Sequence, residues 1–208
     1  TKEGHHTPRQ TNLGHLVKIL FTGGGSAGHV TPNIALIEHF QQVGWDIVYV
    51  GSVMGIEREL ITSVPYRAIS SGKLRRYFDW QNFLDPFRIL WGFMQSLVIC
   101  LRERPHVVFS KGGFVAVPIV FAAWFWRIPV ICHESDVTPG LANKLCFPVV
   151  RKICINFPET ARYIKHADKT VVTGTPIRNS ILNGSRQAAC DAFGLSADQA
   201  TLLVFGGS

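Results

Sequence analysis

Residues 16–32 constrain the fold of this chain most, because an apolar run there leads through a glycine-rich loop into the start of a helix. The run at 16–21 is short and apolar with β-branched members, which is typical of a buried parallel strand. The glycines that follow let the backbone turn sharply and approach a ligand closely, because no Cβ intervenes. We expect Thr31 to cap a helix that begins at Pro32 and continues to Val43. Free backbone N–H groups at such a helix start bind anions, usually phosphates.

Apolar runs and helical patterns alternate along the rest of the chain. We expect further strands at 46–50, 66–69, 106–110, 129–132, 152–155 and 170–172. We expect helices at 55–62, 83–104, 114–126 and 186–193. Another helix is expected to have Thr138 as its cap and Pro139 as its first residue. Two more are expected to begin at Pro158 and directly after Arg178. Strands that alternate with helices predict an α/β protein with a Rossmann-like, mostly parallel sheet and helices on both faces. Ligands of such sheets bind at the carboxyl ends of the strands.

The end of the chain resembles its beginning, because 201–208 reads as an apolar strand that enters a glycine loop with a serine. We therefore expect a second α/β unit to start near Thr201 and to be truncated after Ser208, with a last strand and a loose tail as the alternative. The expected organisation is a polar leader or tail at 1–15, a first domain at 16–182, a linker at 183–200 and the first strand and glycine loop of a second domain at 201–208.

Composition narrows the classes of function. Hydrophobic residues make up 47% of the chain and charged residues 17%, as in a folded protein. The formal charge of +7 favours nucleic acid, an anionic membrane surface or a phosphorylated substrate as partner. Five scattered cysteines without a C-x-x-C pair indicate neither a disulfide framework nor a zinc site, and favour a reducing cytoplasm.

The sequence contains no clear secretory signal, membrane-spanning segment or metal-binding motif. No apolar run reaches the roughly 20 residues of a membrane-spanning helix, and the polar start carries no secretory signal. His5, His6 and His15 can bind a metal, but no cysteine or carboxylate cluster completes a site, so we expect a leader or tail and no metal.

The glycine loop formally matches the dinucleotide pattern G-x-G-x-x-G between Gly23 and Gly28. A dinucleotide site also requires an acidic residue after the second strand, whereas that strand ends Val-Gly-Ser here. The loop therefore favours a phosphate cradle, with a ligand-free sharp turn as the alternative. His29 at the exit of the loop can act as a general base, because its unperturbed pKa lies near 6.5, or can simply hydrogen-bond the loop.

Charged residues that follow later strands are the other candidates. Glu134 and Asp136 can be catalytic carboxylates, sugar ligands or residues that cap the next helix. Arg178 can pair with a phosphate, although an isolated arginine is more often a surface charge.

Residues 73–104 interleave basic and aromatic residues. This pattern suits a membrane interface with anionic lipids, with nucleic acid as the competing partner and a core helix as the third interpretation. We expect the helix body to be core. The expected exposed membrane contact consists of Lys73, Arg75, Arg76, Tyr77 and Trp80.

Five ordered motifs together resemble the MurG-type N-acetylglucosaminyltransferases of peptidoglycan synthesis, which belong to glycosyltransferase family 28. The motifs are G-G-S-A-G-H-x-x-P at 24–32, G-G-F at 112–114, H-E-x-D-x-x-x-G-x-x-N-K at 133–144, G-x-P-x-R at 174–178 and G-G-S at 206–208. The resemblance implies the N-terminal half of a GT-B glycosyltransferase, which takes the lipid-linked diphosphate acceptor and rests on the membrane. It also implies transfer of N-acetylglucosamine from UDP-GlcNAc to undecaprenyl-diphospho-muramoyl-pentapeptide, by an inverting displacement without metal or cofactor.

The resemblance assigns roles by position. Ser26, Ala27 and Gly28 then lie near the donor and the acceptor diphosphate, His29 is the general base, and Glu134 is a second catalytic candidate. Further substrate-binding candidates are Gly113, Phe114, Asp136, Asn143, Arg178 and Ser208. Phe114 stands where the family often has tyrosine, and Asp136 where it usually has asparagine. A carboxylate only accepts hydrogen bonds, so beside a diphosphate Asp136 needs a cationic neighbour or a proton.

The resemblance also implies a peripheral location at the cytoplasmic face of the bacterial inner membrane, with an anionic membrane surface and no nucleic acid as partner. We expect the 208-residue chain alone to be inactive, because the donor domain is missing from it. The alternatives are a diacylglycerol glycosyltransferase and a non-catalytic membrane-docking subunit of a split transferase, with a dinucleotide oxidoreductase as a remote fourth.

Overall fold

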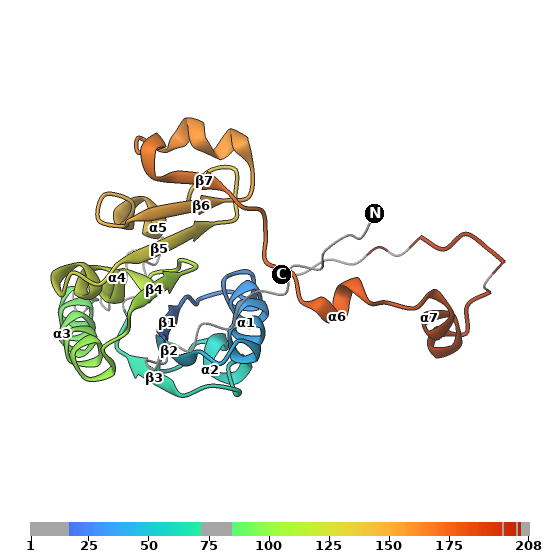
Figure 1. Cartoon of the computed structure of the whole chain (residues 1–208), viewed down its shortest axis with the longest axis horizontal. Helices are drawn as coiled ribbons and strands as arrows, with labels where there is room; N and C mark the ends of the chain where they lie inside the picture. Colours follow the sequence, from blue (N-terminus) through green and yellow to red (C-terminus); the bar gives the residue numbers. More distant parts are fainter. Residues whose placement is uncertain (1–16, 72–84, 197, 203, 205–208) are drawn as a thin grey trace, which may run out of the picture. The chain divides into compact units, whose positions relative to one another are not determined.

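The computed structural model describes residues 17–71, 85–196, 198–202 and 204 (Figure 1). The chain divides into two compact units, Thr1–Pro176 and Ile177–Ser208. The expected leader at 1–15 and the expected membrane contact at 73–80 lie outside the described residues, so both stay predictions.

The first unit is built on a seven-stranded sheet in the order β3-β2-β1-β4-β5-β6-β7, and all neighbouring strands are parallel (Figure 1). The strands are β1 (Lys18–Thr22), β2 (Asp46–Ser52), β3 (Tyr66–Ile69), β4 (Val107–Ser110), β5 (Val130–Glu134), β6 (Lys152–Ile155) and β7 (Thr170–Val172). The strand order reverses between β1 and β4. The loops that follow these two strands therefore flank a crevice at the carboxyl edge of the sheet, where ligands of such folds bind.

Helices cover both faces of the sheet, because successive strand residues point to opposite sides. Phe21 of β1 shares a buried cluster with Ile37 of the first helix, whereas Leu20 shares the opposite cluster with Ile119 of a later helix. The α-helices of this unit are α1 (Ala27–Gln42), α2 (Ile56–Leu60), α3 (Asp85–Glu103), α4 (Ala116–Phe125) and α5 (Leu141–Cys146), and two 3-10 helices follow, η2 (Pro158–Tyr163) and η3 (Ala167–Lys169). The predicted α/β fold with a parallel sheet is thereby confirmed, and β3, β6 and β7 have the predicted bounds.

Helix α1 starts earlier than the sequence predicts. Ser26 is its N-cap with an extended backbone (φ −152°, ψ 156°), so Thr31 and Pro32 lie inside the helix and the expected cap is wrong. Pro32 lacks the N–H that would bond one turn back, a loss that proline imposes within a helix. The backbone N–H of Gly25 donates to the carboxylate of Glu57, 32 residues further along the chain. This long-range contact fixes the loop before the helix, and no local pattern reveals it.

Helix α5, in contrast, begins later than predicted. Gly140 is its N-cap and Leu141 its first residue, so the expected Thr138 cap with Pro139 at the first position is wrong. The N–H of Gly140 donates to the Glu134 carboxylate at 3.0 Å. A side chain of the preceding strand therefore decides where the helix starts.

Helix α3 differs from the expected core helix. Its fully buried residues are the small Gly92, Ser96 and Cys100, one turn apart, and the larger apolar side chains beside them on the inward face are partly buried. Large apolar side chains face solvent instead: Phe87 is 71% exposed and Trp91 62%. The prediction that the helix body is core therefore holds for one face of the helix only, which packs against the buried cluster. The helix is apolar on nearly every side, so periodicity cannot select the packed face, and close backbone approach selects it.

The second unit holds two helices, α6 (Asn179–Leu182) and α7 (Arg186–Phe193). Helix α7 has the predicted bounds, with the Ser185 side chain accepting from the N–H of Ala188 and Gly194 in a left-handed conformation (φ 64°) after its end. The described residues 201, 202 and 204 have no regular secondary structure, and Ser208 lies outside the described residues. The expected linker and second domain stay predictions. Among the described helices, none has the length and hydrophobicity to cross a bilayer.

Candidate active site

The loops after β1 and β4 meet at the point where the strand order reverses. The N–H of Gly24 donates to the carbonyl oxygen of Gly112 at 3.3 Å. Gly113 has φ +82°, and a Cβ at this position would overlap the carbonyl of Gly24. Only glycine combines that backbone conformation with such a close approach. The predicted Gly113 is therefore needed to join the two loops, whatever else it contacts.

A buried carboxylate supports the glycine loop from the side of β2. Glu57 of α2 is fully buried and accepts hydrogen bonds from the N–H of Gly25 at 3.2 Å and from Ser52 N and Oγ at 2.9 and 2.7 Å. A Cβ on Gly24 would collide with this carboxylate. Glu57 was not predicted as a site residue. Glu59, two residues later in the same helix, is exposed. The local sequence does not show which of the two glutamates is buried.

Tyr49 and Asn33 hold the end of β1. The Tyr49 hydroxyl donates to the carbonyl of Gly23 at 2.7 Å, and the Asn33 amide donates to that hydroxyl at 3.2 Å and to the carbonyl of Thr22 at 3.3 Å. Burial raises the pKa of Tyr49, so this phenol keeps its proton and stays a donor. The strand end and the loop are therefore fixed before any ligand arrives.

His29 lies in the first turn of α1 and is half-buried. Its Nδ1 is 3.1 Å from the carbonyl oxygen of Gly24 and 3.1 Å from Ser26 Oγ. A carbonyl oxygen can only accept, so this geometry assigns the proton to Nδ1. In the neutral ring Nε2 then carries the free lone pair, which is the site that accepts a proton in general base catalysis. The structure therefore confirms that His29 hydrogen-bonds the loop. Its role as a general base stays a prediction, with which this hydrogen bond is compatible.

Glu134 ends β5 and orders the loop that follows it. Its carboxylate accepts hydrogen bonds from the N–H of Asp136 at 2.9 Å, the N–H of Gly140 at 3.0 Å and the side-chain amide of Asn143 at 2.9 Å. These contacts support the interpretation in which Glu134 organises the next helix start. Asn143 is buried and donates to the Glu134 carboxylate, so one role of Asn143 is to support this loop.

Lys111 directly follows β4 and is a functional candidate, although it was not predicted as a site residue. Its side chain is 1% exposed, and its Nζ donates to Ser135 Oγ. Burial lowers the pKa of Lys111, while the carboxylates of Glu134 and Asp136 act in the opposite direction. The sequence feature that indicates a functional role for Lys111 is its position directly after a central strand and directly before two glycines.

A cavity of about 270 Å³ opens between these loops. It brings together seven of the predicted residues: Ser26, His29, Gly113, Phe114, Glu134, Asp136 and Asn143. Ala27 and Gly28 are exposed in the first turn of α1 but do not line it. Arg178 belongs to the second unit, and Ser208 lies outside the described residues. Among the described residues, no three His, Cys, Asp or Glu side chains gather as a metal site.

Comparison with protein families gives one match over most of the sheet. The model of the glycosyltransferase family 28 N-terminal domain matches residues 19–155. This span runs from β1 to β6 and contains the three loops that form the cavity.

Comparison with curated proteins gives relatives with one recurring name, UDP-N-acetylglucosamine--N-acetylmuramyl-(pentapeptide) pyrophosphoryl-undecaprenol N-acetylglucosamine transferase. The relative from Legionella pneumophila (strain Lens) is 55% identical over 192 residues, which is 91% of this chain and 53% of the relative. The relative from Clostridium kluyveri is 55% identical over 193 residues, 92% of this chain and 54% of the relative. The chain thus spans about half the length of these relatives.

Comparison with solved structures agrees on the fold. MurG of Acinetobacter baumannii is 26% identical with a TM-score of 0.65, over 78% of this chain and 46% of that one. A UDP-N-acetylglucosamine 2-epimerase from Rickettsia bellii has a TM-score of 0.62 over 88% of this chain and 52% of that one. Its sequence identity is only 14%, so this likeness concerns the fold alone.

Proposed function

This chain belongs to glycosyltransferase family 28, and from that premise we propose that its first unit forms the acceptor side of an inverting N-acetylglucosaminyltransferase. The proposed reaction moves N-acetylglucosamine from UDP-GlcNAc to undecaprenyl-diphospho-muramoyl-pentapeptide, which turns lipid I into lipid II. The name of the relatives at 55% identity supports this substrate pair.

The hydrogen bond between His29 and Gly24 is the observation that carries the proposal. It leaves Nε2 as the proton acceptor beside a cavity of a size to hold part of a substrate. In the proposed step, His29 Nε2 takes the proton of an acceptor hydroxyl while that oxygen bonds to the anomeric carbon of the donor sugar. The bond from this carbon to the diphosphate breaks, and UDP leaves with the electron pair. Attack opposite to the leaving group inverts the anomeric configuration.

The start of α1 supplies the proposed diphosphate contact. A helix of 16 residues begins at Ala27, and its first N–H groups have no partner within the helix. Such groups and the helix dipole favour a bound anion. We assign Ser26, Ala27 and Gly28 to this contact, in agreement with the resemblance.

Three further side chains complete the proposed site, and the resemblance assigns Asp136 among them to the donor. Phe114 and Asp136 line the cavity, and Asn143 both lines it and supports Glu134. We keep Glu134 as the residue that positions this loop. Arg178 and Ser208 remain proposed donor contacts on the resemblance alone.

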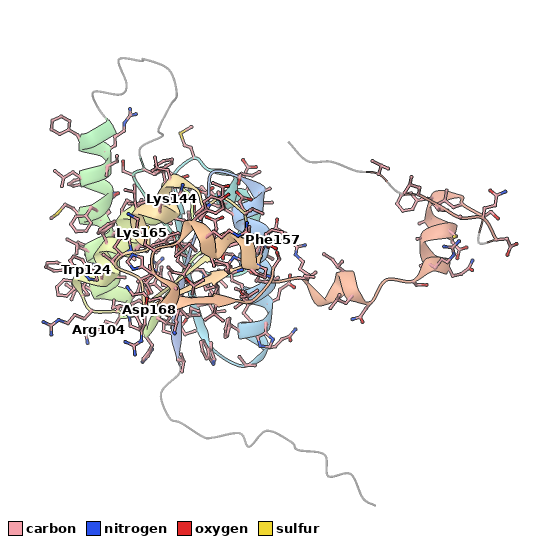
Figure 2. All side chains as sticks on the ribbon, turned by 90° about the horizontal axis from the view of Figure 1, so that it is seen from above. Arg104, Trp124, Lys144, Phe157, Lys165 and Asp168 are labelled. Atoms are coloured by element: carbon pink, nitrogen blue, oxygen red, sulfur yellow. The ribbon has the colours of Figure 1, made fainter. Side chains whose placement is uncertain are left out.

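The outer surface of α3 and α4 is the proposed membrane contact, which we call the α3/α4 face. Its exposed apolar side chains are Phe87, Ile89, Leu90, Trp91, Met94, Trp124 and Phe125. A groove of about 530 Å³ runs between the two helices. Figure 2 shows the side chains of α3 projecting away from the sheet, with Trp124 labelled at the same edge. Aromatic and aliphatic side chains that share an exposed face are typical of contacts with a membrane interface.

The net charge supports the same partner. The chain carries a formal charge of +7, and the cytoplasmic leaflet of bacterial membranes is anionic. We therefore propose a peripheral position at the cytoplasmic face of the inner membrane. The basic segment at 73–80 remains the proposed companion of the α3/α4 face.

A transfer assay tests the proposed reaction. The 208-residue chain is continued by the part of the Legionella relative that lies beyond the matched region, and labelled UDP-GlcNAc is offered with a lipid-linked muramoyl-pentapeptide. We expect the labelled disaccharide lipid, formed equally well in excess EDTA. His29→Ala should lower the rate of the chemical step by about 10²–10⁴-fold, the typical contribution of a general base. His39→Ala is the matched control, since His39 lies exposed on the same helix and should leave the rate unchanged.

The same assay separates the alternatives. Preferred glycosylation of diacylglycerol over the muramoyl lipid would replace the proposed acceptor. A folded chimera that transfers nothing, together with capture of a separate UDP-sugar-binding polypeptide by the 208-residue chain, would favour the non-catalytic docking subunit. A near-normal rate for His29→Ala would remove His29 as the base.

A further inference from the structure

The lining of the cavity has an unfavourable charge for an anionic ligand. It contains the carboxylates of Glu134 and Asp136 and no lysine or arginine among its described residues. Two carboxylates next to a diphosphate repel it, because like charges a few ångströms apart raise each other's free energy. A site that binds a diphosphate there requires a compensating positive charge within a few ångströms of the wall.

Asp136 is held so that its carboxylate stays at the cavity. Its N–H donates to Glu134 at 2.9 Å, and its carbonyl oxygen accepts from Thr160 Oγ1 at 3.2 Å. The preceding carbonyl, that of Ser135, accepts from the Asn156 amide at 3.1 Å. The backbone is thus fixed on both sides of the residue. Its carboxylate accepts no hydrogen bond from the part of the chain that the structure describes.

Lys111 is the cation behind this wall. It comes from β4, the strand next to β5, and its buried Nζ donates to the hydroxyl of Ser135, the residue immediately before Asp136. The charged or titratable groups that interact with it are the carboxylates of Glu134 and Asp136, the thiol of Cys132 and the imidazole of His133. The two carboxylates of the cavity therefore both attract this ammonium, although neither forms a direct ion pair with it among the described residues.

We propose that Lys111 is a positioning residue whose buried ammonium neutralises Asp136 and thereby allows the cavity to accept the diphosphate of the substrate. The inference rests on the proposed function for the identity of that substrate. It resolves the departure noted in the sequence, because it supplies the cationic neighbour that an aspartate requires at this position. Lys111 and Asp136 then form one functional unit: loss of the cation is harmful only while the carboxylate remains.

A double-mutant cycle on the 208-residue chain tests this coupling, with inorganic pyrophosphate as the probe and calorimetry as the measurement. Lys111→Met keeps much of the side-chain volume and removes the charge. We expect its dissociation constant for pyrophosphate to rise about 10- to 100-fold, as for the loss of one charge-assisted interaction. Adding Asp136→Asn removes the exposed acid, so the double variant should bind within about threefold of the unchanged chain.

Two controls separate this effect from general damage. Lys152→Met removes an equal charge from the first residue of β6, at the opposite edge of the sheet, and should leave pyrophosphate binding unchanged. Asp136→Asn alone removes one of the two carboxylates that compensate the ammonium and should tighten binding several-fold, a result that does not depend on whether Lys111→Met folds. Additive effects in the cycle, or weaker binding by Asp136→Asn, would overturn the inference, as would an unchanged chain that does not bind pyrophosphate.

A ligand-free measurement completes the test. NMR titration of the Lys111 side chain should find it protonated at pH 7, and Asp136→Asn should lower its pKa further, because one attracting carboxylate is lost. A neutral Lys111 at pH 7 would overturn the inference. Neither measurement uses UDP-GlcNAc or a lipid acceptor, so failure of the transfer assay would refute the proposed function and leave the Lys111–Asp136 coupling standing.

Discussion

Two histidines of the first unit, His29 and His133, have opposite hydrogen-bonding patterns, and the difference separates the proposed general base from a structural side chain. His29 lines the cavity and donates from Nδ1 to the carbonyl of Gly24, and its Nε2 has no partner in the part of the chain that the structure describes. His133 donates from Nε2 to the carbonyl of Gly174 at 2.9 Å, and its buried Nδ1 has no partner among the described residues. Burial, and secondly the charge of Lys111, lower the pKa of His133. We therefore assign His133 to the neutral form in the folded chain.

The lowered pKa of His133 predicts a loss of stability in acid. In the unfolded chain this histidine binds a proton as the pH falls through about 6.5, whereas in the folded chain it resists protonation. The unfolded state then binds more protons, so the contribution of His133 is complete above pH 6.5 and is lost below it. Each unit of difference between the two pKa values corresponds to about 1.4 kcal/mol.

Urea unfolding between pH 7.5 and pH 5 measures this effect. His133→Gln keeps a side-chain N–H that can reach Gly174 but cannot titrate, so its stability should decline less in acid than that of the unchanged chain. NMR titration of His133 gives the folded pKa directly. An imidazole that titrates at or above 6.5 would contradict the assignment.

At the scale of elements, the orientation of α3 is set by a stripe of small residues that lets the helix backbone approach its neighbours closely. Its buried stripe is Gly92, Ser96 and Cys100, and a Cβ on Gly92 would overlap the carbonyl oxygen of Ser70. The Ser96 hydroxyl turns back to donate to the carbonyl of Gly92 at 2.6 Å, so its polar group is satisfied within the helix. Close approach of α3 to the chain after β3 therefore requires glycine, and the larger apolar residues are left on the α3/α4 face.

Two helical glycines should respond oppositely to alanine. Gly92→Ala should destabilise the chain by about 1–3 kcal/mol, since the methyl group forces α3 away from Ser70 and overpacking has costs of that order. Gly28→Ala in α1 meets open space, its nearest atom being Ser26 Oγ at 3.9 Å, and should be neutral or stabilising by up to about 1 kcal/mol.

Chemical denaturation of both variants checks the comparison, with circular dichroism to follow the helix content. Equal, favourable effects of the two substitutions would show that α3 is free to move and that its orientation has another cause.

At the scale of the whole molecule, exposed apolar side chains and a positive net charge both favour binding to an anionic membrane. The α3/α4 face presents aromatic side chains from two adjacent helices, and the chain as a whole carries a formal charge of +7. Apolar groups bind a membrane interface by burial of surface, whereas the charge adds an attraction to anionic lipids that salt screens. The two contributions can therefore be separated by lipid composition and by ionic strength.

Vesicle sedimentation should show binding that rises with the fraction of anionic lipid and falls with salt. Replacing Phe87, Leu90 and Trp91 together by serine should lower partitioning at least about tenfold, because each exposed apolar side chain contributes on the order of 1 kcal/mol or more when buried. Matched substitutions at Val43, Val53 and Met54, which are exposed apolar residues outside the α3/α4 face, should have little effect. Equal losses for the two triple variants would exclude the α3/α4 face as the membrane contact.

The sequence by itself determined the parallel α/β fold, the glycine loop after β1 and the place of His29 at its exit. These features are local: an apolar run between turn residues specifies a buried strand, and glycines in series specify a tight loop. The motifs after β4 and β5 were equally visible, and seven predicted residues do meet in one cavity.

Only the tertiary structure decided which partners those residues have. Hydrogen bonds between different strands and helices join the loops to Glu57, Tyr49 and Lys111. The spacing of residues in the sequence does not reveal these hydrogen bonds. The same reason explains the two misplaced helix starts, because buried carboxylates hold the preceding loops. It also explains the exposed α3/α4 face: in a helix apolar on nearly all sides, packing against neighbours selects the buried side, and hydrophobic periodicity alone cannot.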